Sequence, residues 1–381
     1  MKPKALTLEP ALEPALAAGH PWIYRNRLPP HRLESGDWVR LVAGRAEAVG
    51  VYDAEGQVAV RLYARSRVPD GAWFAARVQE ALELRRRFVP EDTDAYRVLF
   101  GEGDFLPGLV ADRYGRYLVV KTYSEGVRRA VLPGVVRALA RELAPRGIVL
   151  RQQEGLEPLF GEPPPPKLTV REHGLRFLAD LYHGQKTGLF LDQRENRQKV
   201  RELARGARVL NLFAYNGGFS IYALAGGATF ARSVDASEGA LADAEENARQ
   251  NGFLERHEGV RADVFEFLNA HEETYDLVVL DPPSMAGRKT QRRAALRAYL
   301  RLNARALERV RPGGWLATAS CTAQVSPEAF REVLAEAARR AGVRTQLVHE
   351  AGHAPDHPLR PEFPEGRYLK FAVLRALEGG A

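Results

Sequence analysis

The stretch that decides the fold is Asn211-Leu-Phe-Ala-Tyr-Asn-Gly-Gly-Phe-Ser220, which continues an apolar run beginning at Arg208. Paired glycines between a strand and a helix let the backbone approach a ligand closely and leave N–H groups free to bind it. From about Gly184 onward, strand and helix signals alternate, and they predict strands at 208–213, 229–235, 260–263, 276–280 and 314–320. This alternation is typical of an open α/β sheet with parallel strands.

Two shorter regions precede this sheet. Residues 1–70 contain short β-like runs at 38–42, 46–52 and 58–63 separated by glycines, which predict a small β-barrel. The next region carries a helix from Gly71, a second helix at 127–143, and strands at 105–112, 117–122, 147–152 and 167–178. We therefore predict three domains: a barrel at 1–70, a small α/β domain at 71–183 and a larger α/β domain at 184–381.

Composition limits the class of protein. The 381 residues are 45% hydrophobic and 27% charged, which is ordinary for a globular chain. The single cysteine, Cys321, excludes an intramolecular disulfide and a thiolate-rich metal site. No apolar run reaches the length of a membrane helix, and Glu9 and Glu13 interrupt the signal-like start. We expect a cytoplasmic protein with no membrane partner.

Charge and histidine spacing bear on what the chain binds. Lysine and arginine total 55 against 48 acids, giving a net charge of +7, which favours a polyanionic partner but also fits a genome rich in arginine codons. His349, His353 and His357 recur every four residues, but Pro355 and Pro358 break the helical spacing that would bring them to one face. We therefore predict no metal site.

Three features predict a cofactor site where the parallel strands end. The glycine turn is neither a dinucleotide fingerprint nor a P-loop, because the G-x-G-x-x-G spacing and the Gly-Lys-Ser/Thr triplet are absent from it. Asp235 stands eighteen residues after Gly217 and can accept both hydroxyls of an adenosine ribose, while Asp263 can accept the adenine amino group. Together they indicate S-adenosylmethionine in a class I methyltransferase sheet. The alternative for each acid is a helix cap.

The fourth and fifth strands predict the chemistry. The fourth ends in Asp281-Pro-Pro-Ser284, similar to enzymes that methylate exocyclic amines, although those carry an aromatic residue where this chain has Ser284. The fifth ends at Cys321, which brings the only thiol to the same edge. A thiolate that adds to cytosine C6 makes C5 nucleophilic enough to take a methyl group, and Asp281 can relieve charge at N3. The alternative is a cysteine that only fills the core.

Several motifs together resemble the rRNA large-subunit methyltransferase I family, S-adenosylmethionine-dependent cytosine-C5 methyltransferases of 23S rRNA. The motifs are Gly19-His-Pro-Trp-Ile-Tyr, Gly36-Asp-Trp-Val, Lys186-Thr-Gly-Leu-Phe-Leu-Asp-Gln-Arg-Glu-Asn-Arg, the glycine turn, Asp281-Pro-Pro-Ser, Ser320-Cys-Thr and Phe363-Pro-Glu-Gly-Arg-Tyr-Leu-Lys. The resemblance spans the whole chain.

The resemblance implies a PUA domain (pseudouridine synthase and archaeosine transglycosylase) at the N-terminus, a central α/β domain and a Rossmann-like catalytic domain. It implies Cys321 as the nucleophile, with Asp281 beside it. The cofactor contacts it implies are Phe190, Asp192, Arg194, Phe213, Ala214, Tyr215, Asn216, Gly217, Gly218, Asp235, Ala236, Ser237, Asp263, Val264 and Asp281. Related enzymes with two cysteines place the second one at the Asp-Pro-Pro position. This chain has none there, so the base that removes the C5 proton stays open.

Basic residues predict where RNA is held. A helix expected at 288–310 carries them every four residues, at Lys289, Arg293, Arg297, Arg301, Arg305 and Arg309. The N-terminal region adds Arg25, Arg27, Arg32, Arg61, Arg65 and Arg67. Such stripes contact phosphates without reading sequence, and the alternative is a solvated helix face.

The partner we expect is 23S rRNA or an assembling large subunit, and the family resemblance also allows a homodimer. Two other functions stay open at this point: methylation of an exocyclic amine of an rRNA purine, and a PUA-type RNA-binding protein without catalytic activity.

Overall fold

The computed structural model describes residues 3–377, which form two compact units. Unit 1 runs to His173 and adds Ala179–Asp192 and Pro355–Gly366, while unit 2 comprises Gly174–Leu178, Gln193–Ala354 and the chain from Arg367 onward. Within residues 3–377, no helix combines the length and hydrophobicity that crossing a bilayer requires. The division into three domains at residues 70 and 183 stays a prediction.

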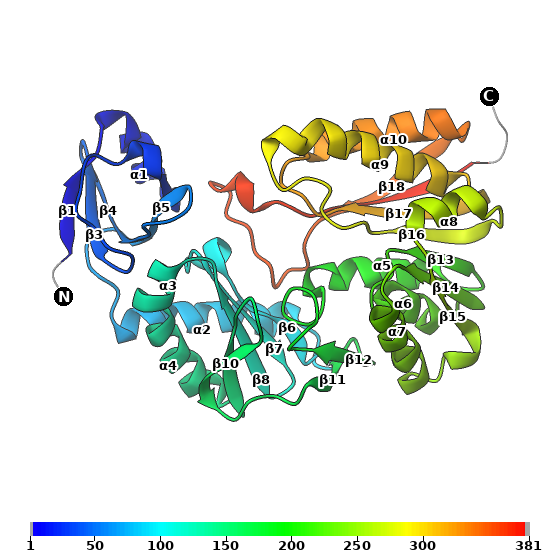
Figure 1. Cartoon of the computed structure of the whole chain (residues 1–381), viewed down its shortest axis with the longest axis horizontal. Coiled ribbons are helices and arrows are strands. Elements are labelled where there is room, and N and C mark those ends of the chain that lie inside the picture. Colours follow the sequence, from blue (N-terminus) through cyan, green and yellow to red (C-terminus); the bar gives the residue numbers. More distant parts are fainter. Residues whose placement is uncertain (1–2, 378–381) are drawn as a thin grey trace. The chain divides into compact units, whose positions relative to one another are not determined.

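Unit 1 begins with a five-stranded sheet in the order β1-β3-β4-β5-β2, in which β1 runs parallel to β3 and the other pairs are antiparallel (Figure 1). The three predicted strands are confirmed as β3, β4 and β5, whereas β1 and β2 were missed because they span only four and three residues. The elements are β1 (Lys4–Thr7), η1 (Pro10–Leu12), α1 (Glu13–Ala18), β2 (Trp22–Tyr24), η2 (Arg25–Arg27), β3 (Trp38–Ala43), β4 (Ala46–Tyr52) and β5 (Val58–Ala64).

A second five-stranded sheet of unit 1 has the order β10-β9-β8-β7-β6. Helices α2 and α4 pack on it, and their residues Val78, Leu82 and Val135 share one core with the strand residues Leu118 and Val120. The elements are α2 (Gly71–Phe88), β6 (Ala95–Phe100), η3 (Gly101–Asp104), β7 (Leu109–Tyr114), β8 (Tyr117–Thr122), α3 (Glu125–Ala130), α4 (Leu132–Leu143), β9 (Gly147–Arg151) and β10 (Leu156–Gly161).

The strand expected at 105–112 is shifted to β7, Leu109–Tyr114, and two further predicted elements in this region are wrong. The helix expected at 127–143 is divided into α3 and α4, because Pro133 lies in the first turn of α4 and has no N–H to continue the helix before it. The strand expected at 167–178 is a hairpin of β11 (Lys167–Glu172) and β12 (Leu175–Asp180). His173 and Gly174 between them both have positive φ, 48° and 73°, which is the geometry of a tight hairpin turn.

Unit 2 contains a seven-stranded sheet in the order β15-β14-β13-β16-β17-β19-β18. The first five strands are parallel, and β19 is antiparallel to both of its neighbours. All five predicted strands are present, although β15 begins and ends earlier than expected. The strands are β13 (Arg208–Leu212), β14 (Phe230–Asp235), β15 (His257–Arg261), β16 (Tyr275–Leu280), β17 (Val310–Ser320), β18 (Thr345–Ala351) and β19 (Lys370–Ala376).

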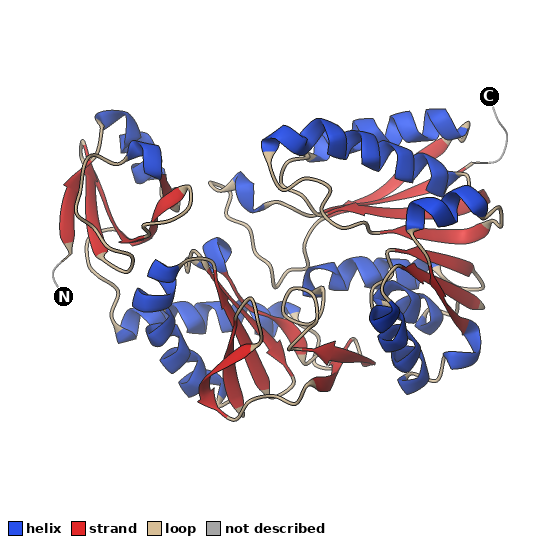
Figure 2. Cartoon of the chain, in the orientation of Figure 1, coloured by secondary structure: helices blue, strands red, loops and turns tan. Residues whose placement is uncertain are grey.

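Helices cover both faces of this sheet (Figure 2). Helices α8, α9 and α10 share a core with one face, and α5 and α6 share a core with the other. The helices are η4 (Leu191–Gln193), α5 (Arg194–Leu203), α6 (Gly218–Ala225), α7 (Glu238–Gln250), η5 (Leu254–Arg256), α8 (Val264–Ala270), η6 (Lys289–Gln291), α9 (Arg292–Leu307), α10 (Pro327–Ala341) and η7 (Pro364–Gly366).

Unit 1 holds a buried ionic cluster around Arg85, which is 1% exposed. The Arg85 guanidinium donates to both carboxylate oxygens of Asp104, at 2.6 and 2.7 Å, and to the main-chain oxygen of Asp356 at 2.7 Å. The Asp356 carboxylate accepts in turn from the main-chain N–H of Arg97 at 2.9 Å. The cluster therefore anchors the distant segment Pro355–Gly366 within unit 1.

Removing one partner from this cluster leaves a buried charge without compensation. We expect Asp104→Ala to lower the free energy of unfolding by about 3–5 kcal/mol, measured by urea unfolding of the full chain. The control is Glu80→Ala in the same helix as Arg85, because the Arg77–Glu80 pair is exposed and its loss costs about 1 kcal/mol or less. Equal effects of the two substitutions would contradict the assignment.

Candidate cofactor-binding and catalytic site

The glycine turn joins β13 to α6 in a strained conformation. Phe213, Tyr215 and Gly217 all have positive φ, at 57°, 48° and 75°. Such values are uncommon for residues with a side chain and concentrate at ligand-binding turns. A Cβ on Gly217 would lie 2.9 Å from the Cβ of Ala244, so this position accepts only glycine for two independent reasons.

A series of hydrogen-bonded polar side chains, most of them buried, supports the turn. The Asn211 amide donates to the Ser220 hydroxyl at 3.0 Å, and that hydroxyl lies 2.7 Å from the Ser233 hydroxyl. Ser233 in turn contacts His257 at 2.8 Å, and burial lowers the pKa of this histidine. Sequence reasoning missed Ser233 and His257, because their role depends on how β13, β14 and β15 pair.

Asp235, the last residue of β14, links this strand to the glycine turn by a hydrogen bond. One carboxylate oxygen accepts from the main-chain N–H of Tyr215 at 2.8 Å, and the other accepts from Ser237 at 2.9 Å. Ser237 is the cap of α7, as its position predicted, since its hydroxyl accepts from the N–H of Ala240. Ser237 and not Asp235 is thus the N-cap of α7, and the predicted contact of Asp235 with a ribose stays a prediction.

Asp263 lies elsewhere than predicted. Strand β15 ends at Arg261, and Asp263 is the N-cap of α8, where one oxygen accepts from the N–H groups of Phe265 and Glu266 at 2.9 and 3.1 Å. The structure thus gives Asp263 the capping role that sequence reasoning considered as its alternative. A cap occupies one carboxylate oxygen, so the predicted contact with adenine stays a prediction.

Asp281 follows β16 and is oriented by two buried amides. The Gln193 side chain donates to its carboxylate at 2.9 Å, and Asn196 donates to the Gln193 oxygen at 2.5 Å. Gln193 and Asn196 are 2% and 1% exposed. The accepted hydrogen bond fixes which way the Gln193 amide points, so its NH2 group is directed to the Asp281 carboxylate. Sequence reasoning quoted both residues in a motif but gave neither a role.

Cys321 follows β17 and lies beside the Asp-Pro-Pro turn. Its Sγ is 3.6 Å from the main-chain oxygen of Pro282, and the side chain is partly exposed. The parallel pairing of Leu280 with Thr318 brings the two strand ends to one edge, as predicted. The pKa of Tyr299 in α9 is raised to about 12, mainly by burial, and the nearby Cys321 and Asp281 contribute to this rise.

The remaining predicted cofactor residues divide between the two units. Phe190 and Asp192 belong to unit 1, where Lys186 donates to the Asp192 carboxylate at 2.6 Å and lies 4.6 Å from the centre of the Phe190 ring. Arg194 belongs to unit 2 and is fully buried at the start of α5. Ala214, Asn216, Gly218, Ala236 and Val264 lie within or next to the elements described above.

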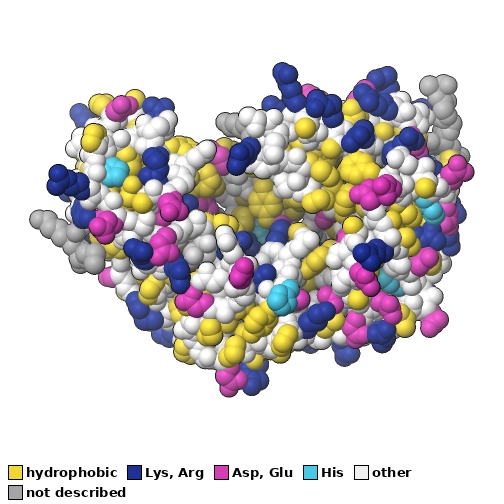
Figure 3. Space-filling model, in the orientation of Figure 1, with side chains coloured by type: hydrophobic (Ala, Val, Ile, Leu, Met, Phe, Trp, Pro, Cys, Tyr) yellow, Lys and Arg dark blue, Asp and Glu magenta, His cyan; other side chains and the backbone are white. Residues whose placement is uncertain are grey.

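The basic stripe is present on α9, in shortened form. Arg293, Arg297, Arg301 and Arg305 are exposed, and Figure 3 shows Lys and Arg side chains over α9 and α10. Arg309 instead turns onto the protein and donates to the main-chain oxygen of Leu268. The Lys289 side chain lies outside the described part of the structure.

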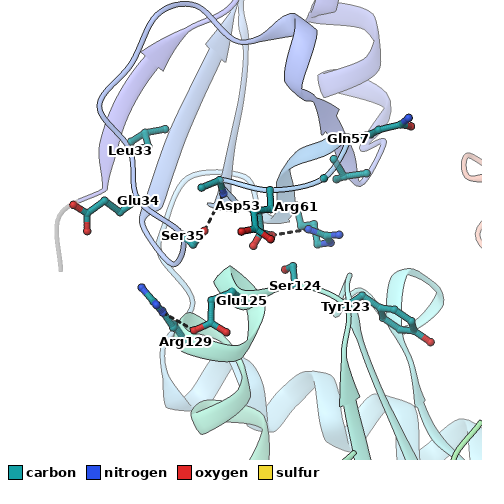
Figure 4. A pocket seen from close by; sticks show the side chains of 14 residues that line it. Leu33, Glu34, Ser35, Asp53, Gln57, Arg61, Tyr123, Ser124, Glu125 and Arg129 are labelled. Atoms are coloured by element: carbon teal, nitrogen blue, oxygen red, sulfur yellow. Dashed lines mark hydrogen bonds and ion pairs between the residues drawn. The ribbon is translucent and has the colours of Figure 1, made fainter. Parts of the chain in front are cut away.

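Two of the N-terminal arginines, Arg25 and Arg61, form hydrogen bonds within unit 1, and their predicted contacts with phosphates stay a prediction. Arg61 donates to the buried Asp53 at 2.6 Å, and Arg25 donates to the main-chain oxygens of Gly56 and Asp53. Arg61 lines a cavity of about 740 Å³ between the two sheets of unit 1 (Figure 4). Carboxylates also line this cavity, so its charge does not favour a polyanion.

No group of three or more His, Cys, Asp or Glu side chains that could hold a metal ion occurs among residues 3–377. His349 is in β18, and His353 accepts a hydrogen bond from the main-chain N–H of Leu369, both in unit 2. His357 belongs to unit 1, where it is buried against Asp356.

Comparison with known proteins gives consistent results. Residues 139–365 match the S-adenosylmethionine-dependent methyltransferase family, and residues 6–65 match the PUA-like domain. A ribosomal RNA large subunit methyltransferase of Deinococcus radiodurans is 42% identical over 398 residues, 97% of either chain. A ribosomal RNA large subunit methyltransferase I of Klebsiella pneumoniae is 36% identical over 394 residues, 98% of either chain. A solved structure described as a methyltransferase complexed with SAH shares the fold, with a TM-score of 0.87 at 23% identity over 98% of this chain and all of the other.

The strained glycine turn makes a prediction of its own. We expect Gly217→Ala to lower the free energy of unfolding by about 1–3 kcal/mol, because alanine would have to adopt positive φ against Ala244. Gly239→Ala is the control, since that glycine lies in α7 with open space around its Cα and should gain about 0.5–1 kcal/mol. Thermal unfolding of both variants tests this, and a neutral Gly217→Ala would refute it.

Proposed function

Because the chain belongs to the ribosomal RNA large subunit methyltransferase I family of S-adenosylmethionine-dependent enzymes, we propose that it methylates C5 of a cytidine in 23S rRNA. The observation that carries the choice of atom is the position of Cys321 beside the Asp281-Pro-Pro turn, with Sγ 3.6 Å from the Pro282 oxygen. A nucleophilic thiol next to a carboxyl group is what addition to a pyrimidine ring requires.

The cofactor site of this proposal is the edge formed by the glycine turn, Asp235 and Asp281. The strained turn brings main-chain groups close to a ligand, and Asp235 lies at the end of the neighbouring strand. These features fit an adenosyl group. A carboxylate can accept hydrogen bonds from its ribose hydroxyls, and the glycine turn lets the main chain approach it closely. Bound there, S-adenosylmethionine supplies an electrophilic methyl group. The further contacts implied by the family resemblance, including Phe190, Asp192 and Arg194, are part of the proposal.

In the proposed reaction the Cys321 thiolate adds to C6 of the cytosine. The new S–C6 bond makes C5 nucleophilic, and C5 would take the methyl group as the methyl–sulfonium bond breaks and SAH leaves. A base then removes the C5 proton, the S–C6 bond breaks, and the thiolate is restored. Asp281 shares a proton with N3 while charge builds on the ring, and Gln193 holds its carboxyl plane in place. Since Cys321 is the only thiol, the base that takes the C5 proton is not a second cysteine.

Substrate binding follows from charge. We propose that the exposed arginines of α9 contact phosphates of the rRNA, because an exposed cationic helix face attracts a polyanion irrespective of its sequence. A base within folded RNA must leave its stack before C6 can reach the thiol.

The cofactor role of Asp235 is tested by binding. We expect Asp235→Asn to weaken SAH binding at least tenfold in isothermal titration calorimetry, because an amide accepts ribose hydroxyls less well than a carboxylate. Glu238→Gln, an exposed residue at the start of α7, is the matched control and should leave affinity unchanged. Equal affinity of Asp235→Asn and wild type would contradict the assignment.

The thiol chemistry is tested by product analysis. We expect wild-type protein to form 5-methylcytidine in 23S rRNA transcripts or in large-subunit precursors, and Cys321→Ser to lower the rate at least a thousandfold, because a hydroxyl at neutral pH is a far weaker nucleophile than a thiolate. Nucleoside mass spectrometry identifies base and atom. A methylated purine amine would support the alternative drawn from the Asp-Pro-Pro motif, and full activity of Cys321→Ser would refute the thiolate mechanism.

A further inference from the structure

Lys370, the first residue of β19, is buried next to the thiol. Only 4% of its surface is exposed, and lysines are rarely buried to this extent unless their charge is paired. Its Nζ donates to the main-chain oxygen of Thr322, the residue after Cys321, and to that of Tyr368 at 2.8 Å. The antiparallel register pairs Lys370 with Ser320, the residue before Cys321. The lysine therefore lies alongside the turn that carries the thiol.

The groups around Cys321 bear on its charge in opposite directions. The Asp281 carboxylate after β16 and the Pro282 oxygen disfavour an anion on sulfur. Tyr299 of α9 is neutral near pH 7, as an ordinary tyrosine is, and burial raises its pKa still further. Lys370 from β19 is the compensating cation, and Arg367 lies near it in the same unit.

The lysine is itself affected by its surroundings. Burial, with a smaller contribution from Arg367, lowers the pKa of Lys370 to about 8, while Cys321 acts in the opposite direction. The ammonium and the sulfur thus favour each other's charged forms. An ammonium has three N–H donors, and two of those of Lys370 are directed to the main-chain oxygens of Thr322 and Tyr368.

We propose that Lys370 is a positioning residue that keeps Cys321 in its thiolate form in the resting enzyme and orients the Cys321–Thr322 turn. The thiol proton passes to solvent and Lys370 stays protonated, so the step needs no further reactant. This inference rests on the proposed function for its purpose, because a preformed thiolate is what addition to C6 consumes. Its physical content, the charge state of one sulfur, can be measured without RNA or cofactor.

The test uses the fact that Cys321 is the only thiol in the chain. Iodoacetamide reacts with thiolates, so its rate of reaction with the whole protein at pH 5–10 reports the titration of Cys321. We expect Lys370→Gln to move the midpoint up by at least one pH unit and to slow alkylation at pH 7 roughly tenfold. Lys370→Arg, which keeps the charge, should stay closer to wild type. Lys199→Gln, at a partly exposed lysine of α5, is the control for loss of one positive charge.

A second measurement keeps the inference testable if the Lys370 variants fail to fold. The ultraviolet absorbance of the thiolate, taken as the difference between wild type and Cys321→Ser, gives the midpoint in the native sequence. A midpoint well below the ordinary thiol value of about 8.5 supports the inference. A midpoint at or above that value, or an unchanged alkylation profile in folded Lys370→Gln, overturns it.

The outcomes separate this inference from the proposed function. If alkylation responds to Lys370 but Cys321→Ser still methylates rRNA, the thiolate is real and the proposed C5 chemistry is wrong. If methyl transfer requires Cys321 but alkylation ignores Lys370, the function stands and this inference fails. If the inference and the proposed function are both correct, the methylation rate of Lys370→Gln should rise with pH toward that of wild type. A merely structural defect would not produce this pH dependence.

Discussion

The parallel register of β13, β16 and β17 is the constraint on which the rest of the site depends. Leu212 pairs with Leu280, and Leu280 pairs with Thr318, so three strands end at one level. Parallel strands emerge at the same edge of a sheet, and loops at that edge converge. Residues far apart in sequence, Gly217, Asp281 and Cys321, therefore lie at the same edge of the sheet because backbone hydrogen bonds align their strands. A slip of one residue in either pairing would turn the side chains on the slipped strand to the other face of the sheet.

The antiparallel strand β19 begins at the edge of the sheet where the parallel strands end. Because it runs opposite to β17, its first residue, Lys370, lies beside the last residues of β17. The chain thereby places a cation from near its C-terminus next to a thiol some fifty residues earlier. A buried ammonium is poorly screened by water, so its electrostatic interaction with the neighbouring sulfur is stronger than it would be at the surface.

Much of unit 2 was predictable because its signals are local. The apolar runs that end at Leu212, Asp235, Leu280 and Ser320 are bounded by glycine, proline or acidic residues, and each predicted strand exists. Predictions failed where a local signal has two structural meanings. The run at 167–178 is apolar enough for one strand, and only the positive φ at His173 and Gly174 turns it into a hairpin. Asp263 sits at a junction where an acid can end a strand or cap a helix, and the two N–H groups of α8 decide for the cap.

Residue chemistry and order along the chain were enough to predict the α/β class, the glycine turn, the carboxylates and the importance of the single cysteine, since strand and helix periodicity is a local property. Family membership followed from comparison over nearly the full chain. The partners of those residues were decided by tertiary structure: Gln193 on Asp281, Asp53 on Arg61, and Lys370 beside Cys321. Each of these contacts joins segments brought together by strand pairing and burial, and neither pairing nor burial is visible in the local pattern of any one segment.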